Sequence, residues 1–93
     1  MAVADRAGKS ANAAIRGTVR GEVQGVGFRD ETVRRAHELD VKGWVRNGED
    51  GEVLVHAEGP EQAVQELIAF LQHGPPSARV SEVAIERVVI EGH

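Results

Sequence analysis

The first residues in this chain that could do chemistry form a glycine-containing loop that ends in an arginine. They are Gln24, Gly25, Val26, Gly27, Phe28 and Arg29. Because helix-forming residues follow, backbone N–H groups of the loop and the positive end of the helix dipole would face one place, which attracts a compact anion. The planar guanidinium of Arg29 could hold two oxygens of a phosphoryl group there.

Asn47 is a second candidate, because it stands at the end of an expected strand over residues 42–47. Its side-chain amide could hold a water molecule or a substrate oxygen through hydrogen bonds. The pair Asn47-Gly48 is also a strong turn signal, so the backbone alone could explain this residue. Both interpretations stay open at this point, and they are compatible with each other.

Other kinds of chemistry find little support in the sequence. The chain has no cysteine, which excludes a disulfide, a thiolate zinc site and a phosphocysteine intermediate. The carboxylates are spread out, with no Asp-x-Asp pair to accept a phosphoryl group or to bind magnesium. We therefore expect no metal and no cofactor. The histidines lack tight metal-ligand spacing, and we expect exposed or mixed faces for His37, His56, His73 and His93.

Length, charge and composition restrict the partners. A chain of 93 residues predicts one domain, and a net charge of −4 with scattered basic residues argues against nucleic acid. No apolar run reaches the roughly 18 residues that span a bilayer, so we expect no membrane partner. We also expect the protein to be a cytoplasmic monomer. Aromatic residues make up only 3% of the chain, and we expect them in the core as Phe28, Trp44 and Phe70.

Hydrophobic periodicity predicts the order of the elements. Alternation indicates strands, and apolar residues three or four apart indicate helices, with Val33, Ala36 and Leu39 on the core face of the first helix. Pro60 suits the first turn of the second helix. In chain order, we expect a flexible tail over 1–14, a strand over 15–23, a helix over 29–39, strands over 42–47 and 52–57, a helix from 60 to 73, and a strand over 79–90.

This βαββαβ order is typical of an α+β, ferredoxin-like domain, here residues 15–93. Such a domain has a four-stranded antiparallel sheet with both helices on one face. In that topology the first two strands both pair with the third, so they run parallel and end at the same edge. Two inter-strand spacings place Gln24 to Arg29 about 10 Å from Asn47, which leaves room for a phosphoryl group and a water.

Several blocks of the sequence resemble the acylphosphatase family. The stretch from Gly21 to Arg29 looks like its signature, and Gly43-Trp44-Val45-Arg46-Asn47 looks like its second block. Shorter matches are Gly51-Glu52-Val53, Glu58-Gly59-Pro60 and Gly74-Pro75-Pro76, so the resemblance covers about residues 15–85. It implies an enzyme that hydrolyses acyl phosphates to a carboxylate and inorganic phosphate. Phosphate or sulfate would then act as product or competing anion.

The resemblance also implies roles for individual residues. Arg29 would be the phosphate-binding arginine, Gln24 to Phe28 would supply an amide cradle, and Asn47 would orient the attacking water. Asp30 and Glu31 depart from the family pattern, which often has bulky side chains there. They suit the first turn of a helix but would repel a dianion nearby. Two alternatives remain, a non-catalytic phosphate- or metabolite-binding module and an interaction domain that uses a sheet edge.

Overall fold

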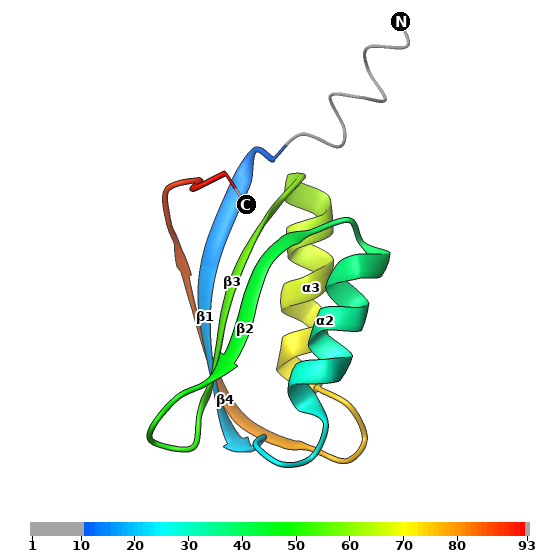
Figure 1. The fold of residues 1–93 in the computed structure, drawn as a ribbon, viewed down its shortest axis with the longest axis vertical. Coiled ribbons are helices and arrows are strands. Elements are labelled where there is room, and N and C mark those ends of the chain that lie inside the picture. Colours follow the sequence, from blue (N-terminus) through cyan, green and yellow to red (C-terminus); the bar gives the residue numbers. More distant parts are fainter. Residues whose placement is uncertain (1–10, 93) are drawn as a thin grey trace, which may run out of the picture.

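The chain folds into a four-stranded sheet covered on one face by two helices (Figure 1). The computed structural model describes residues 11–92. Its elements are β1 (Ala13–Glu22), α2 (Phe28–Glu38), β2 (Lys42–Asn47), β3 (Val53–Gly59), α3 (Glu61–His73) and β4 (Arg79–Arg87). This order confirms the expected α+β, ferredoxin-like arrangement. Within the described range, no helix is long and apolar enough to cross a membrane.

The sheet has the strand order β2-β3-β1-β4, and every neighbouring pair is antiparallel. β1 and β2 flank β3, so they run in the same direction, as expected. Asn47 of β2 and Val19 of β1 both pair with Val53 of β3. The two strands therefore reach one edge of the sheet together, and the loop that follows β1 emerges near Asn47.

The core lies between the sheet and the helices. Alternate residues of β1 and β3 point into it, and α3 contributes a stripe at helical spacing, as the periodicity predicts. Its fully buried members include Ile15, Val19, Val53, Val55, Val64, Leu67 and Leu71. Phe28, at the start of α2, is 1% exposed and packs against Phe70, with ring centroids 6.2 Å apart. The start of α2 is thus anchored in the core.

The buried face of α2 differs from the expected one. Its buried residues are Phe28 and Thr32, whereas Val33 is 55% exposed. The prediction that Val33 shares the core face with Ala36 and Leu39 was therefore wrong, although Ala36 and Leu39 do pack against the core. The helix begins with a buried Phe28, so the positions that follow on its face are Thr32 and Ala36, and Val33 is turned about 100° away.

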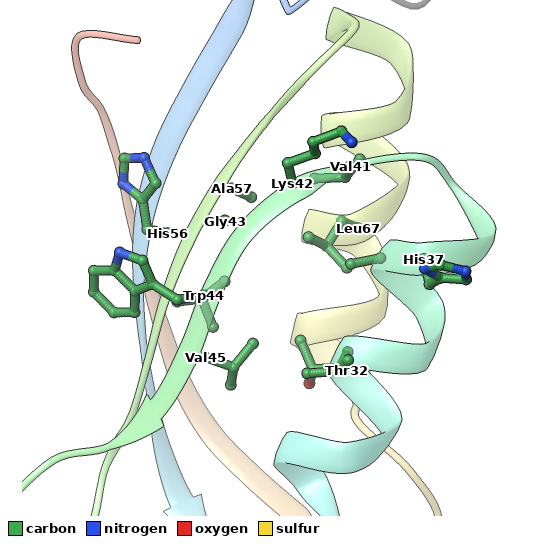
Figure 2. Close-up of a pocket in the computed structure, with 13 residues that line it drawn as sticks. Thr32, His37, Val41, Lys42, Gly43, Trp44, Val45, His56, Ala57 and Leu67 are labelled. Atoms are coloured by element: carbon green, nitrogen blue, oxygen red, sulfur yellow. The ribbon is translucent and has the colours of Figure 1, made fainter. Parts of the chain in front are cut away.

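The outer face of the sheet, away from the helices, carries Trp44 and His56. Their rings stack with centroids 5.7 Å apart, and Figure 2 shows them on the opposite side of the sheet from Val45. Trp44 is only half-buried, so its prediction as a core residue was wrong. Val45 packs toward the helices, and strand alternation turns Trp44 to the other face. His56, expected on an exposed or mixed face, is only 1% exposed.

Several element ends differ from those predicted by one to three residues, and β3, for example, continues to Gly59 instead of ending at residue 57. β1 begins at Ala13, and both Ala13 and Ala14 are buried, so the strand includes two residues assigned to the tail. The first ten residues of that tail lie outside the described range. β4 ends at Arg87 instead of continuing to residue 90, and Val89 and Ile90 are exposed.

Candidate functional site

The loop between β1 and α2 owes its shape to two glycines. Gly25 has φ 74° and Gly27 has φ 82°, in the left-handed region that side chains disfavour. A Cβ atom built on either glycine would meet nothing within 4 Å. Backbone conformation, and not crowding by the protein, therefore requires glycine at both positions, and the space in front of them is open.

The N-terminus of α2 faces the same space. Gly27 is its N-cap residue, and no side chain caps the helix. The first bond of the helix runs from the N–H of Glu31 to the carbonyl of Gly27, at 3.1 Å. The N–H groups of Phe28, Arg29 and Asp30 precede that bond and have no acceptor within the helix. With the helix dipole, they form an electropositive end suited to an anion.

A cavity of about 200 Å³ joins this loop to β2. Its lining residues are Val23, Gly25, Gly27, Phe28, Arg29, Asp30 and Asn47. The structure thus brings together the arginine, both loop glycines and the asparagine that the sequence analysis selected. Val23, the residue just after β1, was not predicted as part of the site. Its place before the glycine loop was the only signal in the sequence.

The guanidinium of Arg29 remains available for a ligand. Arg29 is exposed and takes part in no ion pair within residues 11–92. Its acidic neighbour Glu31 instead binds Arg34, and this hydrogen bond raises the pKa of the Arg34 guanidinium. Asp30 lines the cavity, as expected for a carboxylate in the first turn. The site therefore contains an unpaired cation with one carboxylate beside it.

Gln24 and Val26 belong to the loop but do not line the cavity. The side chain of Gln24 donates from Nε2 to the carbonyls of Gly48 and Glu52, at 3.0 and 2.8 Å. The carbonyl of Val26 accepts a 2.6 Å hydrogen bond from Ser77 Oγ. Both residues connect the loop to other parts of the protein.

The position of Asn47 is compatible with both interpretations that the sequence left open. Asn47 is the last residue of β2, it is exposed, and it lines the cavity. The next residue, Gly48, begins the connection to β3. The N–H of Gly48 donates a 2.8 Å hydrogen bond to the carbonyl of Glu52, which closes this connection. Asn47 therefore stands both at the start of a turn and at the edge of the cavity.

A larger cavity, of about 410 Å³, lies between α2 and β2 (Figure 2). Thr32, Val45 and Leu67 point into this space, and most of its other lining residues are also apolar. Its lining includes His37, Lys42 and His56, but neither the glycine loop nor the N-terminus of a helix. Size alone would favour this cavity, but the chemistry favours the smaller one.

A third cluster, on the outer face, contains His56, Glu58 and Glu91, whose ligand atoms lie within 4.8 Å of one another. Such a set could hold a metal ion. However, Arg16 donates from Nε to His56 Nδ1 at 3.0 Å, which leaves the ring proton on Nε2, at 2.8 Å from the Glu58 carboxylate. In this arrangement Nε2 donates to Glu58 and offers no lone pair to a metal, so the hydrogen bonds favour a structural cluster.

Comparisons with known proteins show which family the chain belongs to. The model of the family described as Acylphosphatase matches residues 15–93. An acylphosphatase from Burkholderia ambifaria is 55% identical over 73 residues, which cover 78% of this chain and 74% of that relative. The crystal structure of acylphosphatase from Bacillus subtilis superposes with a TM-score of 0.84 at 38% identity, covering 87% of this chain and 91% of that one. An acylphosphatase from Coxiella burnetii superposes equally well, with a TM-score of 0.84 at 41% identity over 87% of this chain and 85% of that one. The fold, the family model and these relatives together place the chain in the acylphosphatase family of hydrolases.

Proposed function

We propose that this hydrolase cleaves the carboxyl-phosphate bond of acyl phosphates in the cavity between the β1–α2 loop and Asn47. The observation that carries the proposal is the meeting of an unpaired arginine, an uncapped helix N-terminus and Asn47 around about 200 Å³ of space. In this scheme Arg29 and the amides of the loop hold the phosphoryl group. Asn47 holds the water.

The reaction suits a site without a general acid. The oxygen of water attacks phosphorus, the bond from phosphorus to the acyl oxygen breaks, and the carboxylate leaves with the electron pair. Because a carboxylic acid has a pKa of about 4, this group departs without being protonated. The protons of the water end on the phosphate product or in solvent. The chain therefore has only to position the reactants and stabilise charge.

Arg29 and the backbone amides can supply that stabilisation. Charge spreads over the equatorial phosphoryl oxygens in the transition state, and donors already directed at them need no reorganisation. The fork of Arg29 grips two oxygens, while the N–H groups at the start of α2 reach the others. The exposure of Arg29 supports this role, and so does the fact that Arg29 forms no ion pair within residues 11–92.

Asn47 is proposed to orient the attacking water. Its amide can accept a hydrogen bond from the water and donate one to a phosphoryl oxygen. Holding nucleophile and phosphorus in line removes much of the entropic barrier to reaction. A neutral side chain is enough for this task, since water needs a fixed position more than a strong base.

The test is release of inorganic phosphate from benzoyl phosphate and acetyl phosphate in the presence of EDTA. We expect turnover that saturates with substrate and is inhibited by added phosphate. A non-catalytic phosphate-binding module would show a rise in Tm with phosphate but no turnover. An interaction domain would show neither. Either of these results would contradict the proposal.

We further propose that the enzyme acts without a metal, as a monomer in the cytoplasm. The proton on His56 Nε2 argues against the clearest candidate metal cluster within residues 11–92. The absence of cysteine from the full sequence suits a reducing compartment. Activity retained in EDTA, the mass measured by light scattering and fractionation of the source cells would test these points separately.

A further inference from the structure

The side chain of Gln24 joins the two halves of the cavity. Its Nε2 has two hydrogens, and they reach the carbonyls of Gly48 and Glu52 at 3.0 and 2.8 Å. Gly48 directly follows Asn47 in the chain, and Glu52 ends the connection to β3. Gln24 itself begins the loop that leads to Arg29. One half-buried amide therefore connects the phosphate-binding loop to the hairpin that carries Asn47.

Two other side chains donate hydrogen bonds to backbone carbonyls of the loop and of the start of α2. Ser77, which precedes β4, donates from Oγ to the carbonyl of Val26 at 2.6 Å. Thr32 donates from Oγ1 to the carbonyl of Phe28 at 2.8 Å, within α2. Neither of these bonds reaches the hairpin. Among the side-chain hydrogen bonds within residues 11–92, the link between the loop and the neighbourhood of Asn47 comes from Gln24.

We propose that Gln24 is a positioning residue that sets the separation between the phosphoryl group and the water held by Asn47. This inference rests on the proposed function of the cavity. Gln24 does not line the cavity, so it acts through Asn47 and not on the substrate. One of its hydrogen bonds reaches Gly48, the residue next to Asn47. A small backbone movement at Gly48 would therefore shift the side chain of Asn47. Misplacement by about 1 Å can lower a rate by about 100-fold.

The first experiment compares Gln24→Met with the wild type. Methionine keeps a similar length and loses both donors, while the Glu52 carbonyl still accepts the hydrogen bond from the Gly48 N–H. We expect kcat to fall at least about 10-fold, or about 1.4 kcal/mol. The inhibition constant for inorganic phosphate should change by less than about 3-fold, because the loop and Arg29 remain. An unchanged kcat in folded Gln24→Met would overturn the proposal.

A double-mutant cycle with Asn47→Ala then separates positioning from general stabilisation. Once Asn47 is removed, Gln24 has no side chain to position, so adding Gln24→Met should lower kcat little further. The matched control is Ser77→Ala, which removes the hydrogen bond from Ser77 to the carbonyl of Val26 in the same loop. Its effect on kcat should be additive with that of Asn47→Ala. Equal factors for Gln24→Met in both backgrounds would contradict the positioning role.

A pH profile of Gln24→Glu offers a chemical signature. An ionised carboxyl cannot donate, whereas a protonated one donates a single hydrogen bond. The ratio of kcat in Gln24→Glu to kcat in Gln24→Met should therefore rise as pH falls through the ordinary glutamate range, near a pKa of about 4.3. A ratio that does not change with pH would contradict donation at this position.

Hydrogen exchange keeps this inference testable apart from the proposed function. Amides in residues 48–52 should exchange faster in Gln24→Met than in the wild type, because the hairpin has lost its anchor. Unchanged exchange there would overturn the link even if the wild type turns over acyl phosphates. Conversely, faster exchange in a protein without turnover would keep the link and reject the proposed function.

Discussion

Two polar clusters lie toward opposite ends of β3, and they are built in opposite ways. At the end that begins with Val53, Arg29 and Asn47 are exposed around an open cavity. Toward the other end, His56 and Glu58 are only 1% and 2% exposed. Glu58 accepts hydrogen bonds from His56 and from the backbone N–H groups of Glu91 and Gly92. The donors around the cavity are available to a ligand, whereas the donors around Glu58 form hydrogen bonds within the protein.

The difference separates binding from structure. A site for a transient anion must keep donors directed at empty space, because each donor spent on the protein is lost to the ligand. A buried polar cluster must do the reverse, since an unpaired group there is costly. Changes at the cavity should therefore alter kinetics and leave stability nearly intact, whereas changes at His56 and Glu58 should lower stability and leave the chemistry intact.

The sharpest test of this division is Arg29→Ala. Loss of the charged fork should lower kcat/KM by about 1000-fold or more, or about 4 kcal/mol. Arg29→Lys should restore little, because an ammonium cannot make the bidentate contact. The control is Arg20→Ala, which removes an exposed arginine of β1 and should keep normal activity. A folded Arg29→Ala protein with more than about a tenth of the activity would refute the role.

Glu58→Leu should have the opposite effect. It would remove the carboxylate that accepts hydrogen bonds from the buried His56 ring and from the partly buried N–H groups of Glu91 and Gly92. Breaking a buried charged contact in this way costs about 3 to 5 kcal/mol, which corresponds to a Tm lower by more than about 10 °C. Phosphate release by the folded fraction should stay normal, and Glu86→Leu, at an exposed position of β4, should change Tm far less. A kinetic defect with normal Tm would break the comparison.

Asn47→Ala tests whether the asparagine serves more than its turn. We expect kcat to fall by about 100-fold, or about 2.7 kcal/mol, with little change in KM. The control is Asp50→Ala, an exposed residue of the same hairpin connection that does not line the cavity. If Asn47→Ala lowered Tm but kept a normal kcat in the folded fraction, the asparagine would act only in the hairpin.

Asp30→Asn concerns the one carboxylate that lines the cavity. Removing its charge should tighten inhibition by phosphate, most clearly at low salt, where repulsion reaches beyond about 10 Å. Stability should fall by up to about 1 kcal/mol, since Asp30 complements the helix dipole. Glu31→Gln is the control, because Glu31 is already paired with Arg34. Equal inhibition constants for Asp30→Asn and the wild type at low salt would mean that the Asp30 charge does not reach the bound anion.

The smallest effect is expected at an exposed ion pair, Glu61 with Arg87, that belongs to neither cluster. Hydrogen bonds from Arg87, and then from Gln65, lower the pKa of Glu61 from 4.5 to about 2. Its contribution is therefore complete above pH 4.5 and is lost progressively as pH falls toward 2. Both partners are exposed, so solvent keeps the contribution small. The Tm difference between wild type and Glu61→Gln should shrink across that range, and a constant difference would contradict the assignment.

Sequence patterns alone predicted much of the fold. The order of strands and helices followed from periodicity, and the topology then implied that Asn47 would share an edge with the glycine loop. Both expectations are confirmed. The roles of Arg29 and Asn47 followed from residue type and family resemblance, and these roles remain predictions that the variants above will test.

The tertiary structure decided which face each residue occupies and which groups pair. Alternation shows that neighbours in a strand lie on opposite faces, but it does not tell which face is covered, so Trp44 was misplaced. His56 became buried because Arg16, Trp44 and Glu91, from three other segments, lie against it. The link from Gln24 to Gly48 joins residues 24 positions apart. Such contacts depend on how the elements pack together, and local sequence contains no record of that packing.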